Sequence, residues 1–239
     1  MKIRKLKKII FVIILLISLA LKSLGSPASS NDTEDIVTGH EHEQINLHLW
    51  HPQYQEKCYF SDRDNVRNTN IETIKKLLTL LKKEPIISNY LLSFSKKKNT
   101  IVCIDERDDE TRGYYDFKYN IIGLKDHLEL FEKLIILVHE LRHICHFNKG
   151  YVNSLDYDID EIIRMNFAIE ADVQAIVTLY AWRMKEIDIN EVWNAIYGFE
   201  HYFDIAEEFE QEIKRSKDEM KATYAAFVQW YKSEWRVDK

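Results

Sequence analysis

The chain has 239 residues, of which 46% are hydrophobic and 30% are charged, and its formal net charge is −6. This length suits one ordinary domain with shorter appendages, and the acidic balance argues against nucleic acid as a partner. Glycine and proline are scarce, at six and three residues, so a mostly helical fold is expected.

The first 25 residues have the layout of a signal peptide. Residues 1–8 carry five basic side chains, residues 9–21 are strongly apolar, and residues 23–26 include small side chains suited to cleavage. At about 1.5 Å per residue the apolar stretch is shorter than the ~30 Å hydrocarbon core of a membrane. We therefore predict a cleaved signal peptide, residues 1–25, and an exported protein, periplasmic or secreted. The alternative is an uncleaved segment that anchors the chain in a membrane.

The next segment, residues 26–51, is predicted to be a flexible tether, because it begins with a polar run that lacks any periodicity. Cleavage after Gly25 removes six basic residues and no acidic ones, so the net charge changes from −6 to −12. The tether ends in a group of histidines, His40, His42, His48 and His51. These imidazoles could capture metal ions, although a polar segment with unrelated histidines is the simpler interpretation.

Two helices are predicted to follow the tether. Thr69 and Glu72 have the spacing of a capping box, and apolar residues then recur at helical intervals, which predicts a helix ending near Glu84. Pro85 begins a second helix, which ends in a solvated run of lysines at residues 96–98.

Two strands are predicted next. Residues 100–105 are rich in β-branched side chains and bounded by charge, residues 107–112 form a charged loop, and residues 114–122 are expected to be a second strand. The two strands should form a small sheet packed on the helix that follows. The predicted fold class is therefore α+β, mostly α.

The helix that follows the strands carries an HExxH pattern, His139-Glu140-Leu141-Arg142-His143. We expect this helix to be capped by Asp126 and to run to about Phe147. Positions four apart on a helix differ by about 40° around the axis, so both imidazoles can face one metal ion while Glu140 lies beside it. Five consecutive apolar residues precede the pattern, at 134–138, so the helix is expected to be buried. Burying two His and one Glu without a metal ion would be costly.

A third ligand is expected from the next long helix, predicted at residues 159–185. Glu170 stands 27 positions after His143, which is far enough for the chain to turn and return antiparallel. Gln174 shares its helical face and could accept a hydrogen bond from the outer nitrogen of a ligand His. Asp172 points about 200° away from Glu170 and is interpreted as a solvated or helix-pairing acid.

The C-terminal part is predicted to hold two or three further helices. Residues 188–191 and 216–219 each have the form of a capping box. Aromatic residues are frequent here and are expected to serve as core and cleft wall: Trp193, Tyr197, Tyr202, Phe203, Tyr224, Phe227, Trp230, Tyr231 and Trp235.

HELRH at residues 139–143, followed by EADVQA at residues 170–175, resembles the gluzincin group of zinc metallopeptidases. The closest likeness is to small minigluzincin domains and to metallopeptidase domains of bacteria. It extends upstream to residues 113–115 and 120–124, which are similar to the edge strand before the zinc helix. The resemblance implies a zincin-like domain, residues 52–239, with the sheet and the Glu-bearing helix packed on the HExxH helix. Some larger gluzincins carry Asp at the position of Gln174.

The resemblance implies zinc ligands at His139, His143 and Glu170, and a general base at Glu140. It also implies that a peptide or protein substrate binds to the exposed edge of the sheet by strand addition. The equal alternative is that Tyr114, Tyr115 and Tyr119 are simply half-buried aromatic residues of the sheet. The predicted reaction is hydrolysis of a peptide bond by water that Zn²⁺ activates and Glu140 deprotonates. The residue that stabilises the oxyanion is not identified, and the candidates are His201, Tyr202, Tyr157 and Arg164.

The sequence has three cysteines, Cys58, Cys103 and Cys145. They cannot all pair within the chain, and three disulfide pairings remain open in an oxidising compartment. Cys145 lies about 200° around the helix from His143, so it is interpreted as a packed core thiol.

Several alternatives to the peptidase remain. The first is a non-catalytic zinc-binding or metal-handling exported protein, and the second is a helical interaction domain with a fortuitous motif. A His, His, Cys metal site with Cys103 as third ligand is a minor enzymatic alternative. The oligomeric state is not predicted.

Overall fold

The computed structural model describes residues 58–59, 69–107, 110–151 and 157–237. All of these residues belong to one compact unit, Ile45–Lys239. The predicted signal peptide and the tether with its four histidines lie outside the described residues, so they stay predictions, as does the division into residues 1–25, 26–51 and 52–239. Within the described ranges, no helix combines the length and the apolar character needed to cross a membrane.

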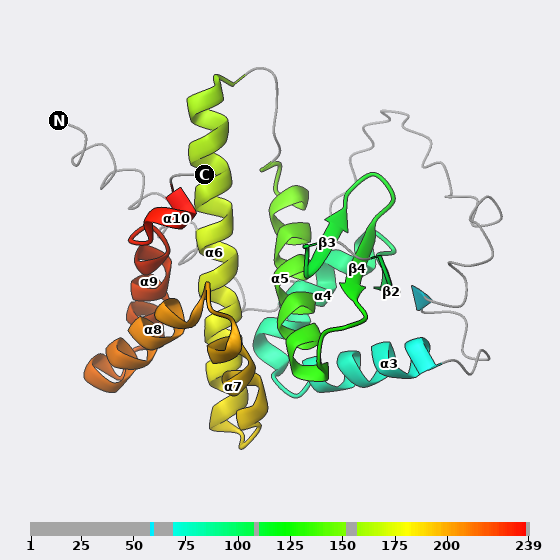
Figure 1. The fold of residues 1–239 in the computed structure, drawn as a ribbon, viewed down its shortest axis with the longest axis horizontal. Coiled ribbons are helices and arrows are strands. Elements are labelled where there is room, and N and C mark those ends of the chain that lie inside the picture. Colours follow the sequence, from blue (N-terminus) through cyan, green and yellow to red (C-terminus); the bar gives the residue numbers. More distant parts are fainter. Residues whose placement is uncertain (1–57, 60–68, 108–109, 152–156, 238–239) are drawn as a thin grey trace, which may run out of the picture. The chain divides into compact units, whose positions relative to one another are not determined.

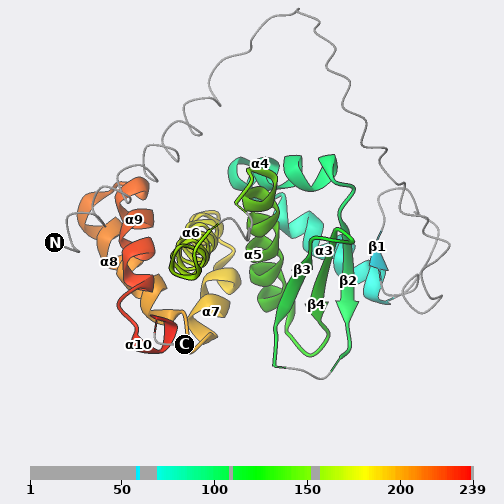
Figure 2. The ribbon, with the colours of Figure 1, turned by 90° about the horizontal axis from the view of Figure 1, so that it is seen from above.

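The sheet has four strands among the described residues: β1 (Cys58–Tyr59), β2 (Ile101–Asp105), β3 (Gly113–Asp116) and β4 (Ile121–Lys125). Their order is β1-β2-β4-β3. The two central strands, β2 and β4, are parallel, whereas β1 and β3 pair antiparallel with their neighbours. Strand β3 therefore forms one edge of this mixed sheet, on the side of the helix that follows β4 (Figure 2).

The predicted strand at residues 100–105 is confirmed as β2, but a single strand over residues 114–122 is wrong. These residues form the hairpin of β3 and β4. Asp116 Oδ1 accepts hydrogen bonds from the backbone N–H groups of Lys118 and Tyr119, and Asn120 adopts a left-handed conformation with φ of 54°. Asp and Asn favour such local turns, and this turn chemistry outweighs the aromatic strand pattern around it.

The two predicted N-terminal helices are present as α3 (Thr69–Leu81) and α4 (Pro85–Lys97). Helix α3 ends earlier than Glu84 because that residue caps the next helix. The Glu84 carboxylate accepts hydrogen bonds from the backbone N–H groups of Ile86 and Ile87, which satisfies two of the amides that a helix start leaves unpaired.

Helix α5 (Leu130–Asn148) carries the HExxH pattern. The prediction that Asp126 caps this helix is wrong, because the N-cap is Glu129. Its backbone N–H donates to the Glu132 carboxylate at 2.8 Å, as in a capping box. The helix is followed by Gly150, whose φ of 83° suits a residue without a Cβ.

Helix α6 (Ile159–Glu186) agrees with the predicted long second helix, and its N-cap Asp158 accepts a hydrogen bond from the backbone N–H of Glu161. Helices α5 and α6 lie side by side and run in opposite directions (Figures 1 and 2). The first three turns of α6 have no buried residue, so this end of the helix is open to solvent.

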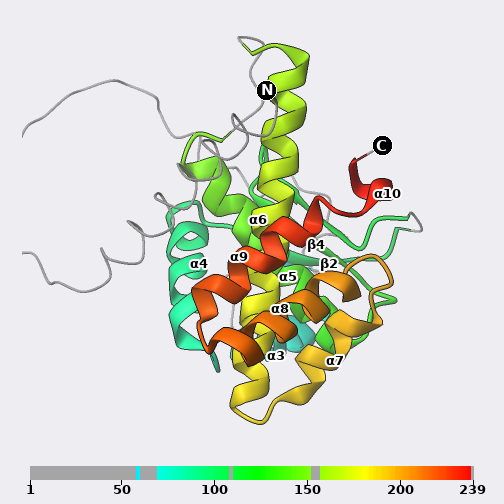
Figure 3. The same cartoon turned by 90° about the vertical axis from the view of Figure 1, so that its left-hand side faces the viewer.

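The C-terminal part forms α7 (Asn190–Gly198), α8 (Phe203–Ser216), α9 (Glu219–Trp230) and the short α10 (Glu234–Val237). Helices α8 and α9 pack against each other, and α9 also packs on α6 (Figure 3).

Both predicted C-terminal capping boxes are wrong in detail. Asp188 adopts a left-handed conformation with φ of 63° and precedes the N-cap of α7. At the start of α9 the cap is Asp218, whose carboxylate accepts from the backbone N–H groups of Met220 and Lys221. The aromatic set is only partly core: Trp193 and Trp230 are buried, whereas Tyr224 is exposed.

One hydrophobic core joins the sheet to the helices. Alternate residues of β2 and β4 point to the same face, and this face contributes Val102, Ile104, Ile122 and Leu124 to the core around α5. The predicted packing of a small sheet on the HExxH helix is thus confirmed. The opposite face holds a second buried cluster, Cys58, Ile101, Cys103 and Ile121.

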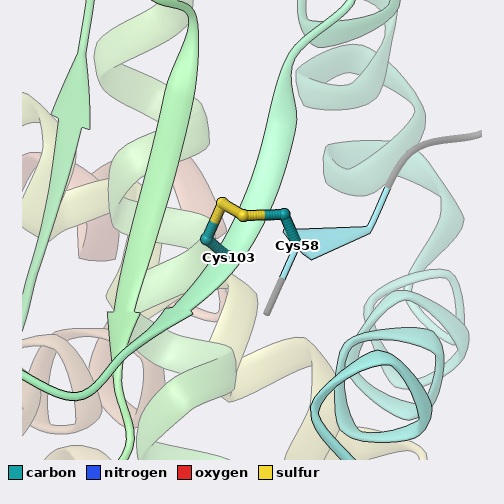
Figure 4. The surroundings of a disulfide bond; sticks show 2 residues. All are labelled: Cys58 and Cys103. Atoms are coloured by element: carbon teal, nitrogen blue, oxygen red, sulfur yellow. A yellow bond between two sulfur atoms is a disulfide. The ribbon is translucent and has the colours of Figure 1, made fainter. Parts of the chain in front are cut away.

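A disulfide bond joins Cys58 of β1 to Cys103 of β2 (Figure 4). These residues stand directly opposite each other in the sheet, so the bond fixes the edge strand β1 to its neighbour. Of the three pairings that the sequence leaves open, the structure contains this one. Cys145 is a free, buried thiol, as predicted for a core residue.

Candidate metal centre

Three side chains from two helices converge on one point. His139 and His143 extend from α5 and Glu170 from α6, and one donor atom of each lies within 4.8 Å of the others. The two histidine Nε2 atoms are 3.0 Å apart. The Glu170 carboxylate lies 3.6 Å from Nε2 of His139 and 3.3 Å from Nε2 of His143. The residues predicted as ligands are therefore brought together.

The spacing of these donor atoms matches what a small divalent ion requires. Zinc bonds of about 2.0–2.1 Å at tetrahedral angles separate neighbouring ligand atoms by about 3.3 Å. The separations of 3.0 to 3.6 Å bracket this value, with each histidine nearest to a different carboxylate oxygen of Glu170. The Glu170 side chain is also 42% exposed, so solvent reaches the group.

The electrostatic environment favours a cation at this point. Burial lowers the pKa of His139 to about 4 and holds the pKa of His143 well below its usual value. Both imidazoles are therefore neutral at neutral pH and offer a lone pair. The Glu170 side chain is only partly exposed, and the burial of its carboxyl group raises its pKa to about 7. A bound cation would favour the charged carboxylate.

Glu140 lies beside the three donors and is 6% exposed. Burial and the nearby charge of Glu170 raise its pKa to about 8. A Cβ added to Gly113, at the start of β3, would lie 3.7 Å from Oε1 of Glu140 and 2.3 Å from Cγ2 of Ile136. The contact with Ile136 excludes a larger residue, so glycine allows the edge strand to lie this close to α5, one turn before Glu140.

Gln174 lies one turn after Glu170 on α6 and is buried. Its side chain forms a hydrogen bond with His139 that opposes the effect of burial on the pKa of that imidazole. The amide Nε2 of Gln174 has no hydrogen-bond partner among the described residues. The structure thus places Gln174 against a candidate ligand, where the sequence predicted a supporting hydrogen bond.

Asp172 joins α5 to α6 beside the three donors. Its Oδ2 accepts from Nε of Arg142 at 2.7 Å and lies 2.9 Å from Nε2 of His146. Burial alone would raise the pKa of Asp172, but Arg142 and His146 outweigh it and hold this pKa well below its usual value. The helix-pairing interpretation is confirmed and the solvated one is wrong. Sequence reasoning missed Arg142 and His146, although their spacing of four residues places them on one face of α5.

Tyr202 is the candidate oxyanion residue with the clearest connection to the site. Burial raises the pKa of its phenol, the charges of Glu170 and Glu140 raise it further, and those of Arg112 and Arg236 lower it. Two other candidates lie in exposed positions: Tyr157 is 51% exposed and Arg164 forms a solvent-exposed pair with Asp160.

The segment that carries Tyr202 is held by Arg236, a residue that sequence reasoning missed. The buried guanidinium donates to the backbone carbonyl of His201 at 2.6 Å and to both carboxylate oxygens of Asp204. It also donates to the carbonyl of Trp230 at 2.8 Å. Helix α10 therefore fixes the residues on either side of Tyr202.

The His, His, Cys alternative is wrong, because the Cys103 sulfur is bonded to Cys58. A thiolate ligand would have to be free.

A family model described as "Putative metallopeptidase family (DUF6782)" matches residues 52–239 of the chain. Comparison with curated proteins and with solved structures found no match.

Proposed function

Because the chain belongs to this metallopeptidase family, we propose that it is a zinc-dependent peptidase of the gluzincin type. His139, His143 and Glu170 hold the zinc ion in this proposal, and Glu140 is the general base. The observation that carries it is the convergence of three donor atoms within 4.8 Å, beside a second acidic side chain, Glu140, that is not one of them.

The donor set favours zinc over harder cations. Two neutral imidazoles and one carboxylate form a ligand type common in catalytic zinc sites, whereas magnesium and calcium prefer oxygen ligands throughout. When bound, zinc lowers the pKa of a coordinated water and polarises the substrate carbonyl. Gln174 supports this ligand set, because its side chain forms a hydrogen bond with His139, whose Nε2 lies 3.0 Å from Nε2 of His143. In the proposal this hydrogen bond is made by the ring nitrogen that does not bind zinc.

Glu140 supplies the proton transfers. Its carboxylate is anionic once a cation lies nearby, since the positive charge opposes the burial that raises its pKa. It accepts a proton from the attacking water and passes it to the amine of the leaving peptide. Tyr202 is proposed to donate a hydrogen bond to the oxygen of the reacting carbonyl, because its raised pKa keeps the phenol protonated and the charges of Glu170 and Glu140 both act on it.

The edge strand β3 is proposed to bind the substrate backbone. One side of β3 pairs with β4, and β3 is the last strand in the order of the sheet. A peptide that adds to its other side would pass Gly113, which lies against Glu140, so strand addition would bring a peptide bond to the general base.

Glu140→Gln separates the peptidase from a zinc-binding protein without catalysis. The variant keeps the size and hydrogen bonding of the side chain but removes its basicity. We expect it to hold as much zinc as the wild type and to lose at least about 100-fold in kcat, as for loss of a general base. Cleavage of a peptide library and metal analysis of both proteins would measure this. Equal cleavage by wild type and variant would contradict the proposal.

A further inference from the structure

Two phenylalanines form a partly exposed stack at the end of β3. The ring of Phe117, just after β3, lies 5.5 Å from the ring of Phe147 on α5 at an interplanar angle of 26°. The ring centroids of Tyr115 and Phe147 are 6.4 Å apart in an edge-to-face arrangement. We propose that this stack, the Phe117–Phe147 platform, binds an aromatic or large apolar side chain of the peptide substrate. The inference rests on the proposed function and assigns a substrate preference to the same site.

The platform lies along β3 from the candidate catalytic group. At the start of the strand, Gly113 lies against Ile136 and Glu140, and two residues later Tyr115 contacts Phe147. Strand β3 and helix α5 therefore run in the same direction, side by side (Figures 1 and 2). One end of the strand lies beside Glu140 and the other leads to the platform.

This direction fixes which part of a substrate would meet the platform. A peptide added to the edge of a sheet pairs more stably when it is antiparallel to the strand. Its N-terminal residues would then run toward Asp116, where β3 ends, and beyond it toward the platform. The platform therefore faces residues on the N-terminal side of the bond to be cleaved.

The distance fixes the position in the substrate. Phe147 stands four residues after His143 and seven after Glu140, which is about 6 and about 10 Å along a helix axis. An extended peptide advances about 3.3 Å per residue. The side chain over the platform is thus expected two or three residues before the bond that is cleaved.

The exposure of Phe117 supports a binding role. Single exposed apolar side chains are common on protein surfaces, but Phe117 is 62% exposed while its ring is already oriented by stacking on Phe147. Lys98 lies over the Phe147 ring, with its Nζ 5.9 Å from the centroid. A third ring added to such a stack buries apolar surface and gains aromatic contact without reordering the protein.

The test compares two peptides with the full-length chain. They share one cleavage site and differ by Phe or Gly at the position two or three residues before it. We expect the wild type to favour the Phe peptide by about ten-fold in kcat/KM, in keeping with one added aromatic contact. Phe117→Ala should reduce this ratio to below about three-fold, and Phe117→Trp should preserve it. The ratio of kcat/KM for the two peptides does not change when a variant lowers kcat/KM for both by the same factor.

Tyr224→Ala is the matched control, because Tyr224 is an exposed aromatic residue on α9. It should leave the ratio as in the wild type. A wild type that cleaves both peptides equally, or prefers aromatic residues only after the cleaved bond, would overturn the inference and leave the peptidase standing. A wild type with bound zinc that cleaves no peptide would overturn both.

Discussion

The Glu170 carboxylate lies 3.3 Å from Nε2 of His143, although the two residues are 27 positions apart and belong to different helices. Two residues further along α6, Asp172 is bound to Arg142, the neighbour of His143. The buried ion pair thus fixes the two helices against each other close to the point where their donor atoms meet. The geometry of the site depends on this pairing as much as on the HExxH helix.

Breaking the buried ion pair should destabilise the protein strongly. Asp172→Leu leaves the Arg142 guanidinium buried without its partner, and removing one member of such a pair costs about 3–5 kcal/mol. Urea unfolding of the metal-free protein measures this. Asp160→Leu removes the partner of Arg164 from an exposed pair and should cost less than about 1 kcal/mol. Similar losses for the two variants would show that the buried pair contributes little.

Removing the amide beside His139 should weaken zinc binding. Outer partners of ligand histidines typically contribute about 10- to 100-fold in metal affinity, so Gln174→Leu should raise the zinc Kd by that factor. Competition with a chromogenic chelator measures the Kd, and Gln211→Leu on the exposed surface of α8 is the control. An unchanged zinc Kd for Gln174→Leu would show that Gln174 does not strengthen zinc binding.

The metal-free protein should lose stability as the pH rises above about 6.5. The folded-state pKa values of Glu170 and Glu140 are raised from 4.5 to about 7 and about 8. Such groups stabilise the fold fully below pH 4.5, and this contribution is lost as the pH rises through the raised values. The lowered pKa of His139 acts in the opposite direction below its usual value of 6.5, because the unfolded chain gains the proton first as the pH falls. It offsets the loss from the carboxyls between pH 4.5 and 6.5, so the net loss of stability is expected above about pH 6.5.

Bound zinc should abolish the loss of stability above about pH 6.5, since a cation favours the anionic carboxylates. Thermal unfolding between pH 5 and 8, with zinc and after its removal by a chelator, provides the measurement. A metal-free protein whose stability stays constant or increases between about pH 6.5 and 8 would be inconsistent with buried protonated carboxyls.

The C-terminal contact of Arg236 should affect turnover more than substrate binding. Arg236→Ala frees the backbone on either side of Tyr202, so kcat should fall by about ten-fold or more with little change in KM, as for a group that acts in the transition state. Tyr202→Phe should likewise lower kcat with little change in KM, and Arg236→Lys should have a higher kcat than Arg236→Ala. A rise in KM alone would place Tyr202 and Arg236 outside the reaction.

Local patterns in the sequence predict much of the fold and the convergence at the site. The four-residue spacing of His139 and His143 and the apolar run before them are properties of one helix, and they predict α5 directly. The hairpin at Asp116 to Asn120 was missed because its turn residues lie within an aromatic run that favours a strand. The cap of α5 was misplaced by three residues, because Asp126 and Glu129 are both acidic residues before the same apolar segment.

Long-range contacts explain what the sequence could not predict. Nothing local distinguishes Arg236 from other basic residues near the end of the chain, and its importance follows from the carbonyl of His201, 35 positions away. The sequence does not predict the ion pair of Asp172 with Arg142 for the same reason, because the pair forms only when two helices meet in a particular register.

The most direct test of the central claim is zinc-edge X-ray absorption of the purified wild-type chain and of Glu170→Ala. We expect about one zinc per wild-type chain, with two imidazole ligands, oxygen in the remaining positions and no sulfur, and a loss of tightly bound zinc in the variant. A wild-type chain without zinc, a sulfur ligand at about 2.3 Å, or an identical spectrum from Glu170→Ala would contradict it.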